Sequence, residues 1–522
     1  MTARTVFHGG PIRTMDTRLP EASALVVEGD RIVAVHSPGE PLPPARDGDR
    51  VVALRGRTLL PGLVDAHTHL VHWGFRFLRP RLGGAASRGE LLDRIREAHR
   101  ELPPHRLLLG EGWDESAWSD PAFPTRRDLD AIDAARPMVV RRICGHLSVA
   151  NSAALRHFPP GPDVERETGI LLEEASMGIA RIFPPTDAEL DEALEAAGRS
   201  YGSMGVTQVH DMSLPGHLRA FERADSRGSL TLSIAAILPA SHLDELLSSG
   251  LGAGWHRGTV RLRGIKFFSD GSLGARTAAL LEGYSDRPAE SGALLLGFEA
   301  LAGDIARAEE GGVPLCLHAI GDRAVTMVVA AFEKGLSGRE SRLGHRIEHL
   351  EMVDPEALAS MARLGVEASM QPNFIGNWGL AGGLYEQRLG AERTARMNPM
   401  ARVLEAGVRL VLGSDGMPAG VLPGLADAVG APQAAQRLTV GEALAAATRE
   451  AARSGGFSDR GYLATGNRAD LVVLSDLPAD SMSGPEAAAR LRAARVEQVW
   501  SGGQGVFESL ELNPATASSG KG

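Results

Sequence analysis

The feature that most constrains the fold is an alternation of short apolar segments with amphipathic segments along the middle of the chain. Amphipathic stretches rich in Ala, Leu, Glu and Arg separate most of the apolar segments, for example "LAGDIARAEEGG" and "DPEALASMARLG". Apolar strands that alternate with helices are typical of a parallel sheet. The apolar segments, bounded by Gly, Pro or Asp, lie at 58–66, 205–212, 230–238, 262–268, 313–319, 346–350, 366–371 and 408–414. Eight strands in this pattern predict an α/β fold, a (β/α)8 barrel of the TIM type.

The two ends of the chain have a different pattern from the middle. Residues 1–57 contain short β-like runs separated by turns, such as "ASALVVEGDRIVAV". Similar text returns within residues 456–512, in "RADLVVLSDLPAD" and "RVEQVWSGGQGVFES". Alternating apolar and polar residues between Gly, Asp and Pro are typical of strands. We therefore expect one small β-sandwich built from both termini, followed by a disordered tail at 513–522.

The interval 76–199 does not follow the strand–helix rhythm and is too long for one crossover between neighbouring strands. We interpret it as an inserted domain after the first barrel strand. The barrel would then consist of residues 58–75 and 200–455.

Composition limits the class of protein. The chain has 522 residues, a net charge of −10 and only two cysteines. A net acidic chain argues against a nucleic-acid partner, which needs a basic face, and two cysteines provide no disulfide framework or cysteine-based zinc site. No apolar run reaches the roughly 18 residues of a membrane span, and no secretory signal is visible at the start. We expect a cytoplasmic enzyme that does not bind membranes.

The first predicted barrel strand ends in an unusual way, with His67 and His69 in "LPGLVDAHTHL". Alternate residues of a strand point to the same side, and their Cα atoms lie about 6.7 Å apart. Two imidazoles directed toward one point suit a metal ion. Core or surface histidines held by hydrogen bonds are the alternative.

Lysine is rare in this chain, which contains 55 Lys and Arg residues but only Lys266, Lys334 and Lys521 among the lysines. Lys266 lies inside the apolar segment "RLRGIKFFSDGS". A desolvated lysine can lose its proton, whereas arginine essentially cannot. A neutral amine can react with carbon dioxide to give a carbamate, which binds metals as a carboxylate does. An ion-paired lysine is the alternative.

Barrel enzymes place their chemistry at the carboxyl ends of the strands. Six side chains that suit a divalent metal occur at or near these ends: His67, His69, Lys266, His318, His349 and Asp415. Imidazole and carboxylate are ligands of zinc, manganese and iron. We expect a divalent ion, Zn²⁺ first and Mn²⁺ or Fe²⁺ as alternatives. A carboxylated Lys266 would bridge two ions, and without carboxylation a single-metal site remains open.

Asp415 is the predicted catalytic residue. A bound divalent ion lowers the pKa of a coordinated water to about 7. The Asp415 carboxylate can accept a proton from that water and pass it to a leaving amine, so that a general base becomes a general acid.

The order of these residues resembles that of the amidohydrolase superfamily. Text outside the metal set is similar to the YtcJ-like subgroup, amidohydrolase family 3, which includes N-substituted formamide deformylase. It comprises "GWDESAW", "GHLSVANSAAL", "TGILLEEA", "GVTQVHDM", "IKFFSDGSLGARTA", "HAIGDRA", "RIEHLEMVDPE", "SMQPNF", "GSDGMP" and "GNRADLVVL". The resemblance implies metal ligands at the six positions and hydrolysis of an amide-type carbon–nitrogen bond other than a peptide bond. It also implies a small-molecule substrate and a homodimer.

Six further residues are candidates for substrate contacts. The resemblance indicates that Trp113, Asp114 and His146 of the insertion line the pocket, although simple packing of Trp113 is an open alternative. His210 follows the second barrel strand at the expected level of a pocket. Gln371 and Asn373 follow the seventh strand and could reach a substrate.

Three other functions stay open. A deaminase of the same superfamily typically has a glutamate soon after the histidine of the fifth strand, whereas residues 318–322 here read His-Ala-Ile-Gly-Asp. The metal set also permits ester or lactone hydrolysis. A catalytically silent barrel that serves as a binding module would be expected to have lost ligands, and all six are present.

Overall fold

The computed structural model describes residues 4–44, 46–104, 106–252 and 254–509. The chain divides into two compact units, one made of Met1–Leu70 with Gly198–Gly522 and the other of Val71–Ala197. The disordered tail predicted at 513–522 lies outside the described residues. Among the described residues, no helix has the length and apolar character needed to cross a bilayer.

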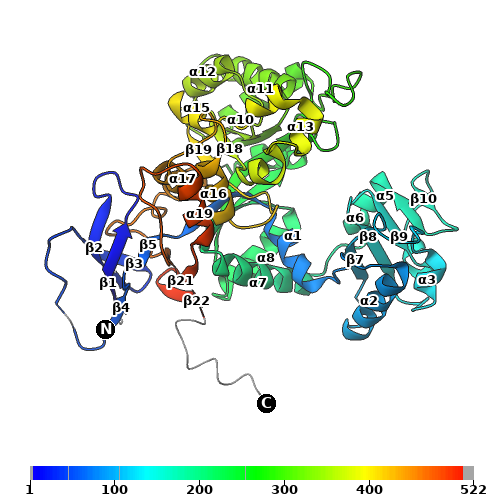
Figure 1. Ribbon diagram of the computed structural model, residues 1–522, viewed down its shortest axis with the longest axis horizontal. Helices are drawn as coiled ribbons and strands as arrows, with labels where there is room; N and C mark the ends of the chain where they lie inside the picture. The colour runs from blue at the N-terminus through cyan, green and yellow to red at the C-terminus, as the bar shows by residue number, and fades with distance from the viewer. Residues whose placement is uncertain (1–3, 45, 105, 253, 510–522) are drawn as a thin grey trace. The chain divides into compact units, whose positions relative to one another are not determined.

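The larger unit contains the predicted barrel, which confirms the fold class (Figure 1). Eight parallel strands follow one another in chain order from β6 to β19. They are β6 (Leu63–Thr68), β12 (Val206–Met212), β13 (Ser233–Pro239), β15 (Val260–Phe268), β16 (Leu315–Ala319), β17 (Arg346–His349), β18 (Glu367–Met370) and β19 (Leu410–Leu412). The first and last strands meet where the amide of Asp415 donates to the carbonyl of His67 at 2.7 Å, which brings the cylinder close to closure.

Helices connect the strands, as a (β/α)8 fold requires. Those between β12 and β19 are α8 (Pro215–Ser226), α9 (Leu243–Ser249), α10 (Phe298–Glu310), α11 (Asp322–Gly335), α12 (Pro355–Leu364), α13 (Leu384–Leu389), α14 (Ala391–Ala395) and α15 (Met400–Glu405). After β19 come α16 (Leu422–Gly430), α17 (Val440–Ala446) and α18 (Arg449–Ser454).

Local sequence explains these elements well. All five residues of β16, Leu-Cys-Leu-His-Ala, are buried, as expected for a strand covered on both faces. Helix α12 begins after Asp354, whose side chain accepts the amide of Ala357 at 2.7 Å. It ends at Gly365, whose φ of 70° is left-handed. An acidic N-cap and a glycine after the last turn are the usual helix boundaries.

Both ends of the chain contribute to one eight-stranded sheet of the larger unit. Its strands are β1 (Arg4–Arg13), β2 (Glu21–Glu28), β3 (Arg31–His36), β4 (Arg50–Ala53), β5 (Thr58–Pro61), β20 (Leu471–Leu474), β21 (Val496–Ser501) and β22 (Gln504–Glu508), and helix α19 (Pro485–Ala493) lies between β20 and β21. The sheet folds over on itself, because Phe7 of β1 and Trp500 of β21 pack at 5.3 Å between ring centroids although two strands separate them. The folded sheet is the expected small sandwich.

The strand expected over 58–66 is two strands. β5 pairs with β20 and β1 in the terminal sheet, and β6 pairs with β12 in the barrel. The break falls at Gly62, where a Cβ atom would lie 2.1 Å from the Thr207 hydroxyl oxygen. Only glycine permits this close approach between the chain and β12.

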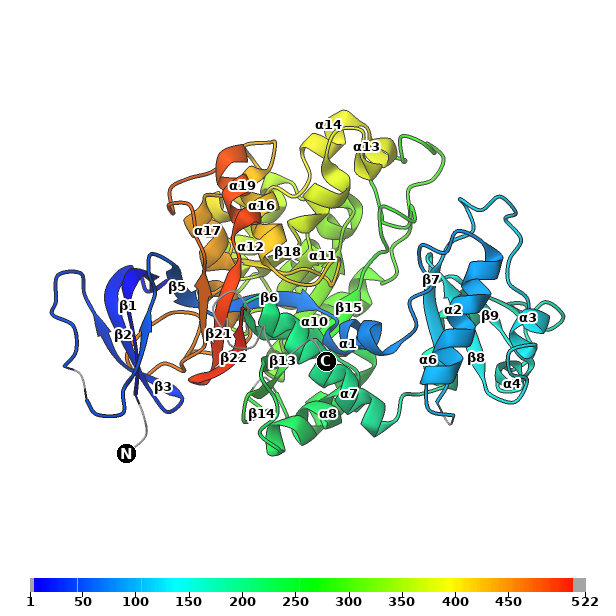
Figure 2. The ribbon, with the colours of Figure 1, turned by 60° about the horizontal axis from the view of Figure 1, so that its bottom comes forward.

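The smaller unit, Val71–Ala197, has a five-stranded sheet and a core of its own. Its strands are β7 (Leu108–Trp113), β8 (Met138–Arg142), β9 (Leu147–Ala150), β10 (Val164–Glu165) and β11 (Ile170–Leu172), and its larger helix is α2 (Arg88–Glu101) (Figure 2). Neighbouring residues of its strands enter two separate apolar clusters, Leu108 one and Leu109 the other. Both faces of this sheet are therefore covered, since successive side chains point to opposite sides.

Candidate active site

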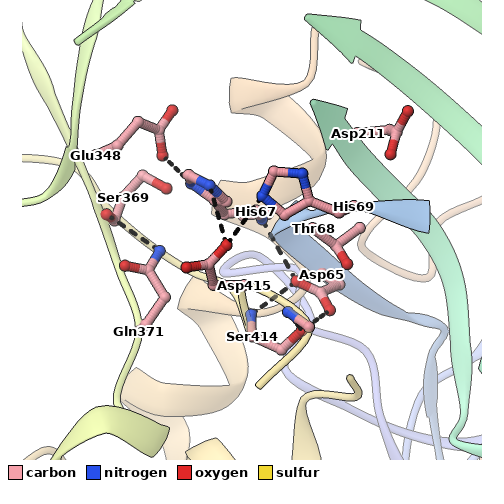
Figure 3. A network of polar contacts seen from close by, with 12 residues as sticks. Asp65, His67, Thr68, His69, Asp211, Glu348, Ser369, Gln371, Ser414 and Asp415 are labelled. Atoms are coloured by element: carbon pink, nitrogen blue, oxygen red, sulfur yellow. Dashed lines mark hydrogen bonds and ion pairs between the residues drawn. The ribbon is translucent and has the colours of Figure 1, made fainter. Parts of the chain in front are cut away.

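His67, His69 and Asp415 form a compact group at the carboxyl ends of β6 and β19. One ligand atom from each lies within 4.8 Å of the other two. The Oδ1 atom of Asp415 is 3.2 Å from Nε2 of His69 and 3.6 Å from Nε2 of His67 (Figure 3). The two histidines point to the same side, as the His-x-His spacing predicts.

The backbone at Asp415 is unusual, because its φ of 54° lies in the left-handed region. Such a conformation is disfavoured for residues other than glycine and occurs mostly where the surroundings impose it. Burial alone would raise the pKa of the Asp415 carboxyl, but the hydrogen bond from His69 and the nearby His67 hold that pKa below its usual range. Asp415 is therefore a charged acceptor at neutral pH.

His318 and His349 form a second pair, with ring centroids 4.5 Å apart. The Nε2 atom of His318 lies 3.0 Å from the carbonyl of Gly271. The Nδ1 atoms of both histidines are buried and have no hydrogen-bond partner among the described residues. Burial lowers the pKa of His318 to about 3 and that of His349 well below its usual value. Both rings are thus neutral and have a nitrogen available for a ligand.

Lys266 lies on β15 and is 5% exposed. Its ammonium lies 5.1 Å from the centre of the Phe268 ring, and burial lowers its pKa. Lys266 lines the same cavity as the four histidines and Asp415. The six predicted ligands therefore converge on one place.

The donor set fits divalent metal ions. Neutral imidazoles and a carboxylate are the ligands that zinc and other first-row metals prefer, and two of the imidazoles have an otherwise unpartnered buried nitrogen. His67, His69 and Asp415 form one group, His318 and His349 form the other, and Lys266 faces the same cavity.

Two neighbouring residues that the sequence analysis did not assign hold His67 in place. Its Nδ1 atom lies 2.7 Å from Oε2 of Glu348 (Figure 3), and Arg346 donates to the other Glu348 oxygen at 2.5 Å. Because this carboxylate is fully buried and ion-paired, His67 carries its proton on Nδ1 and presents Nε2 to the cavity. A charged pair in a buried strand, "RIEH", was the available signal, since buried charges are normally paired.

Asp65 fixes the register between the first and last barrel strands. Its buried carboxylate accepts hydrogen bonds from the amide of Ser414 at 2.8 Å and the hydroxyl of Ser414 at 2.5 Å. Burial raises the pKa of Asp65 to about 6. The residue before Asp415 is thus tied to the strand that carries His67.

A cavity of about 380 Å³ opens over the six ligands. Its other walls are mostly apolar: Met212, Phe268, Leu273, Ile320, Phe374, Trp378, Leu384, Tyr385 and Met417. One more carboxyl, Glu351, also lines it. Burial raises the pKa of Glu351 to about 7. The sequence analysis did not assign a role to Glu351.

The predicted substrate residues of the smaller unit make contacts within that unit. Trp113 is fully buried in its core and donates to the carbonyl of Val140 at 3.2 Å, so the packing alternative accounts for this side chain. Asp114 is 3.2 Å from Arg142, and the exposed His146 is 2.8 Å from Glu173. Substrate contacts of Asp114 and His146 stay a prediction.

The other three candidates lie on the barrel, and none of them lines the cavity. His210 is fully buried, 2.8 Å from Arg346. It lies two residues before the end of β12, and Met212 at that end is the residue of this strand that reaches the cavity. The side-chain amide of Asn373 donates hydrogen bonds to the carbonyls of Ser414 and Met417. Gln371 is buried near Ser369, 3.5 Å from its carbonyl, and its Oε1 atom is unpartnered (Figure 3).

This barrel, with imidazoles and a carboxylate gathered at its strand ends, defines a metal-dependent hydrolase. The chain belongs to the amidohydrolase family, because residues 50–507 match the sequence model of that family. It is 30% identical to the putative amidohydrolase YtcJ of Bacillus subtilis over 450 residues, covering 79% of this chain and 80% of that protein. It is 27% identical over 513 residues to N-substituted formamide deformylase of Arthrobacter pascens, covering 91% and 93% of the two chains.

A solved structure is similar throughout most of the chain. An uncharacterized metal-dependent hydrolase from Pyrococcus furiosus superposes with a TM-score of 0.79 at 29% identity, covering 91% of this chain and 99% of that one. Family membership and this likeness confirm the resemblance found in the sequence and make the protein an enzyme that hydrolyses carbon–nitrogen bonds other than peptide bonds.

Proposed function

We propose that this enzyme hydrolyses a small amide whose substituent is largely apolar, such as an N-formyl, N-acyl or cyclic amide. The observation that carries the proposal is that the six ligand side chains and an apolar cavity of about 380 Å³ meet at one place. A cavity of this size suits a small molecule, and its apolar walls favour a substituent that loses little hydration on entering.

In the proposed mechanism, His67, His69, Lys266, His318, His349 and Asp415 hold one or two divalent ions, zinc being the first expectation. Such ions supply an activated water and polarise the carbonyl of the substrate. Asp415 accepts a proton at a carboxylate oxygen and later donates it to the nitrogen of the leaving amine. Glu348 keeps His67 in the tautomer that presents Nε2 to the cavity.

We further propose that Lys266 is carboxylated in the active enzyme. The amine nitrogen forms a bond to the carbon of carbon dioxide and releases a proton, which leaves a carbamate anion. Its two oxygens would serve both groups of ligands, because Lys266 lines the cavity together with the His67, His69 and Asp415 group and the His318 and His349 pair. The homodimer and the cytoplasmic location stay predictions.

The test is hydrolysis of a matched panel of compounds by the purified metal-loaded enzyme. The panel contains N-formyl, N-acyl and cyclic amides, the corresponding esters, and pyrimidines that carry an exocyclic amino group. Release of free amine from an amide, lost with a chelator and restored by Zn²⁺ or Mn²⁺, is the expected result. Turnover of esters or of ring amines alone would replace the proposal with one of the two rival reactions.

A folded preparation that binds no divalent ion would instead support a silent barrel. Metal content measured by elemental analysis separates this outcome from a wrong choice of substrate, because it does not depend on turnover. Asp415→Asn provides the matched control for turnover, since it removes the proposed proton acceptor with little change in side-chain size.

A further inference from the structure

Glu351 differs from the other buried carboxylates around the site. Its side chain is 1% exposed and lines the cavity, yet its Oε2 atom has no hydrogen-bond partner among the described residues. By contrast, Glu348 is paired with Arg346, and Asp270 accepts three backbone amides. A buried carboxyl oxygen without a partner is costly and indicates that a ligand atom completes it.

The contacts that Glu351 does make leave one side of it free. Tyr385 and the side chain of Asn398 lie close enough to the carboxyl to lower its pKa, against the larger effect of burial. The backbone of Asn398 also donates to the Glu351 carbonyl at 2.7 Å. These contacts hold the group in one orientation. Among the described residues no Lys, Arg or His forms an ion pair with Glu351, and the ammonium of Lys266 lies over Phe268 instead.

Three of the aromatic rings that line the cavity with Glu351 pack in a row: Phe374, Trp378 and Tyr385. The rings of Phe374 and Trp378 have centroids 4.8 Å apart, and those of Trp378 and Tyr385 are 5.9 Å apart. Phe374 also stacks against the ligand His349, with an interplanar angle of 8°. The aromatic wall therefore begins directly beside the metal ligands and continues to Glu351.

We propose that Glu351 and this aromatic wall form a subsite for an ammonium group. A carboxylate provides a charge-assisted hydrogen bond, and the faces of aromatic rings attract a cation that has lost its hydration shell. The preferred substrate is then an amide whose apolar substituent ends in a primary or secondary amine. The inferred substrate preference rests on the proposed function. The inferred binding of an ammonium group does not depend on it.

Calorimetry tests the subsite without any turnover. The metal-loaded enzyme is titrated at pH 8 with n-butylammonium chloride and, separately, with n-butanol, which has the same chain but no charge. The amine is fully protonated at this pH and has no lone pair for a metal. We expect the ammonium to bind about tenfold more tightly than the alcohol, which corresponds to about 1.4 kcal/mol. Equal affinities would overturn the inference.

Glu351→Gln keeps the size of the side chain and removes its charge, so it should abolish this preference. Glu356→Gln, at an exposed position in the first turn of α12, is the matched control and should retain it. If Glu351→Gln does not fold, as judged by its thermal transition, Trp378→Leu at the partly exposed end of the wall takes its place. A preference that survives whichever variant is folded contradicts the subsite.

A kinetic comparison links the subsite to the reaction. The substrates are N-formyl-1,4-diaminobutane, which carries a free ammonium, and N-butylformamide, which does not. A higher kcat/KM for the first, lost in the folded variant, supports the inference. Hydrolysis of both without discrimination removes the subsite and leaves the proposed function intact. If calorimetry shows discrimination but neither substrate is hydrolysed, the subsite stands and the proposed function is contradicted.

Discussion

At the scale of single residues, the site depends on which nitrogen of each imidazole faces the cavity. Glu348 bonds Nδ1 of His67 at 2.7 Å and is itself held by Arg346, which also donates to the carbonyl of Ala66 at 3.1 Å. The carboxylate therefore orients a ligand without facing the cavity itself. Groups in this position tune metal affinity by fixing the tautomer and raising the basicity of the ligand.

Glu348→Gln should weaken metal binding by about 10- to 100-fold, because the amide cannot stabilise the Nδ1 proton as a carboxylate does. The dissociation constant is measured by competition with a chromophoric chelator. Burial of Arg346 without its charge partner should also lower the free energy of unfolding by about 3–5 kcal/mol, so the variant is assayed well below its thermal transition.

The exposed Glu356→Gln substitution is again the control and should leave the dissociation constant unchanged. Wild-type metal affinity in a folded Glu348→Gln variant would show that the His67–Glu348 hydrogen bond does not tune the ligand.

If Lys266 bridges the two groups of ligands as a carbamate, Lys266→Ala should halve the metal content of the enzyme, from two ions per chain to one. Elemental analysis gives the metal content, and ¹³C NMR of protein prepared with labelled bicarbonate detects the carbamate carbon in the wild-type enzyme. Added propionate should restore part of the metal content of the variant, because it supplies a carboxylate in the vacated space. Unchanged metal content with no carbamate signal would leave a single-metal site with a plain lysine.

The convergence of the six predicted ligands on one cavity could be expected from the sequence, because each lies at or near the end of an apolar strand and barrel topology brings all strand ends to one level. Glu348 and Glu351 could not be predicted in the same way. Their roles depend on contacts with His67 and Tyr385, which lie on other elements. His210 shows the limit of the strand-end argument. The strand was expected at 205–212 and β12 does end at Met212, but His210 lies two residues before that end and is buried in the barrel interior.

At the scale of elements, Arg388 of α13 fastens the long loop at 269–297, and Arg276 of the loop shares its carboxylate partner Asp286. Asp286 of the loop lies 2.6 Å from Arg276 and 2.5 Å from Arg388 of α13. The hydrogen bond from Arg276, together with Arg388, lowers the pKa of Asp286 to about 2. Leu273 of the loop and Tyr385 of α13 both line the cavity, so this contact helps to set the shape of the wall.

Asp286→Asn should therefore lower the melting temperature at neutral pH, and the difference from wild type should depend on acidity. Because the pKa of Asp286 falls from 3.8 to about 2 on folding, its contribution to stability is complete above pH 4 to 5 and declines as the pH falls toward 2. Thermal unfolding of both proteins between pH 7 and pH 3 measures this. A difference that stays constant down to pH 3 would contradict the assigned ion pairs.

Gly413 sets the distance between the last and first barrel strands. A Cβ atom here would lie 2.4 Å from the backbone nitrogen of His67 and 2.8 Å from its Cβ atom. Gly413→Ala should destabilise the fold by about 1–3 kcal/mol and displace His67, so that metal affinity falls as well. Urea unfolding and chelator competition measure the two effects.

Gly303→Ala is the matched control, because an added Cβ at this exposed helical position meets no atom within 4 Å. It should stabilise the protein by about 0.5–1 kcal/mol and leave the metal bound. If Gly413→Ala behaved in the same way, the close approach of β6 and β19 would have no influence on the site.

Strand positions were largely predictable, because parallel strands buried on both faces consist of nearly continuous runs of apolar residues. The division of 58–66 into β5 and β6 was not predictable from hydrophobicity, since both halves are apolar. Pro61 and Gly62 mark the break, but only the contact between Gly62 and Thr207 shows why the chain must pass from one sheet to the other there.

At the scale of the whole molecule, the six predicted metal ligands belong to one compact unit and Val71–Ala197 forms another. A ligand that binds only the native state stabilises it by about 2.7 kcal/mol at one hundred times its dissociation constant. Removing the metal should therefore lower the calorimetric transition of the larger unit and leave that of the smaller unit in place. Hydrogen exchange assigns the transitions to segments, and an equal shift of both would show that the units unfold together.

The pairing of β5 with β20 has a consequence for synthesis. During translation, β1 to β5 leave the ribosome long before their partners near residues 471–508 exist. Sheet closure must therefore wait for the synthesis of residues 471–508, whereas residues 71–197 can already collapse around their own apolar clusters. Nascent chains arrested before residue 471 should leave the edge of β5 that pairs with β20 exposed, which is the condition that invites chaperones.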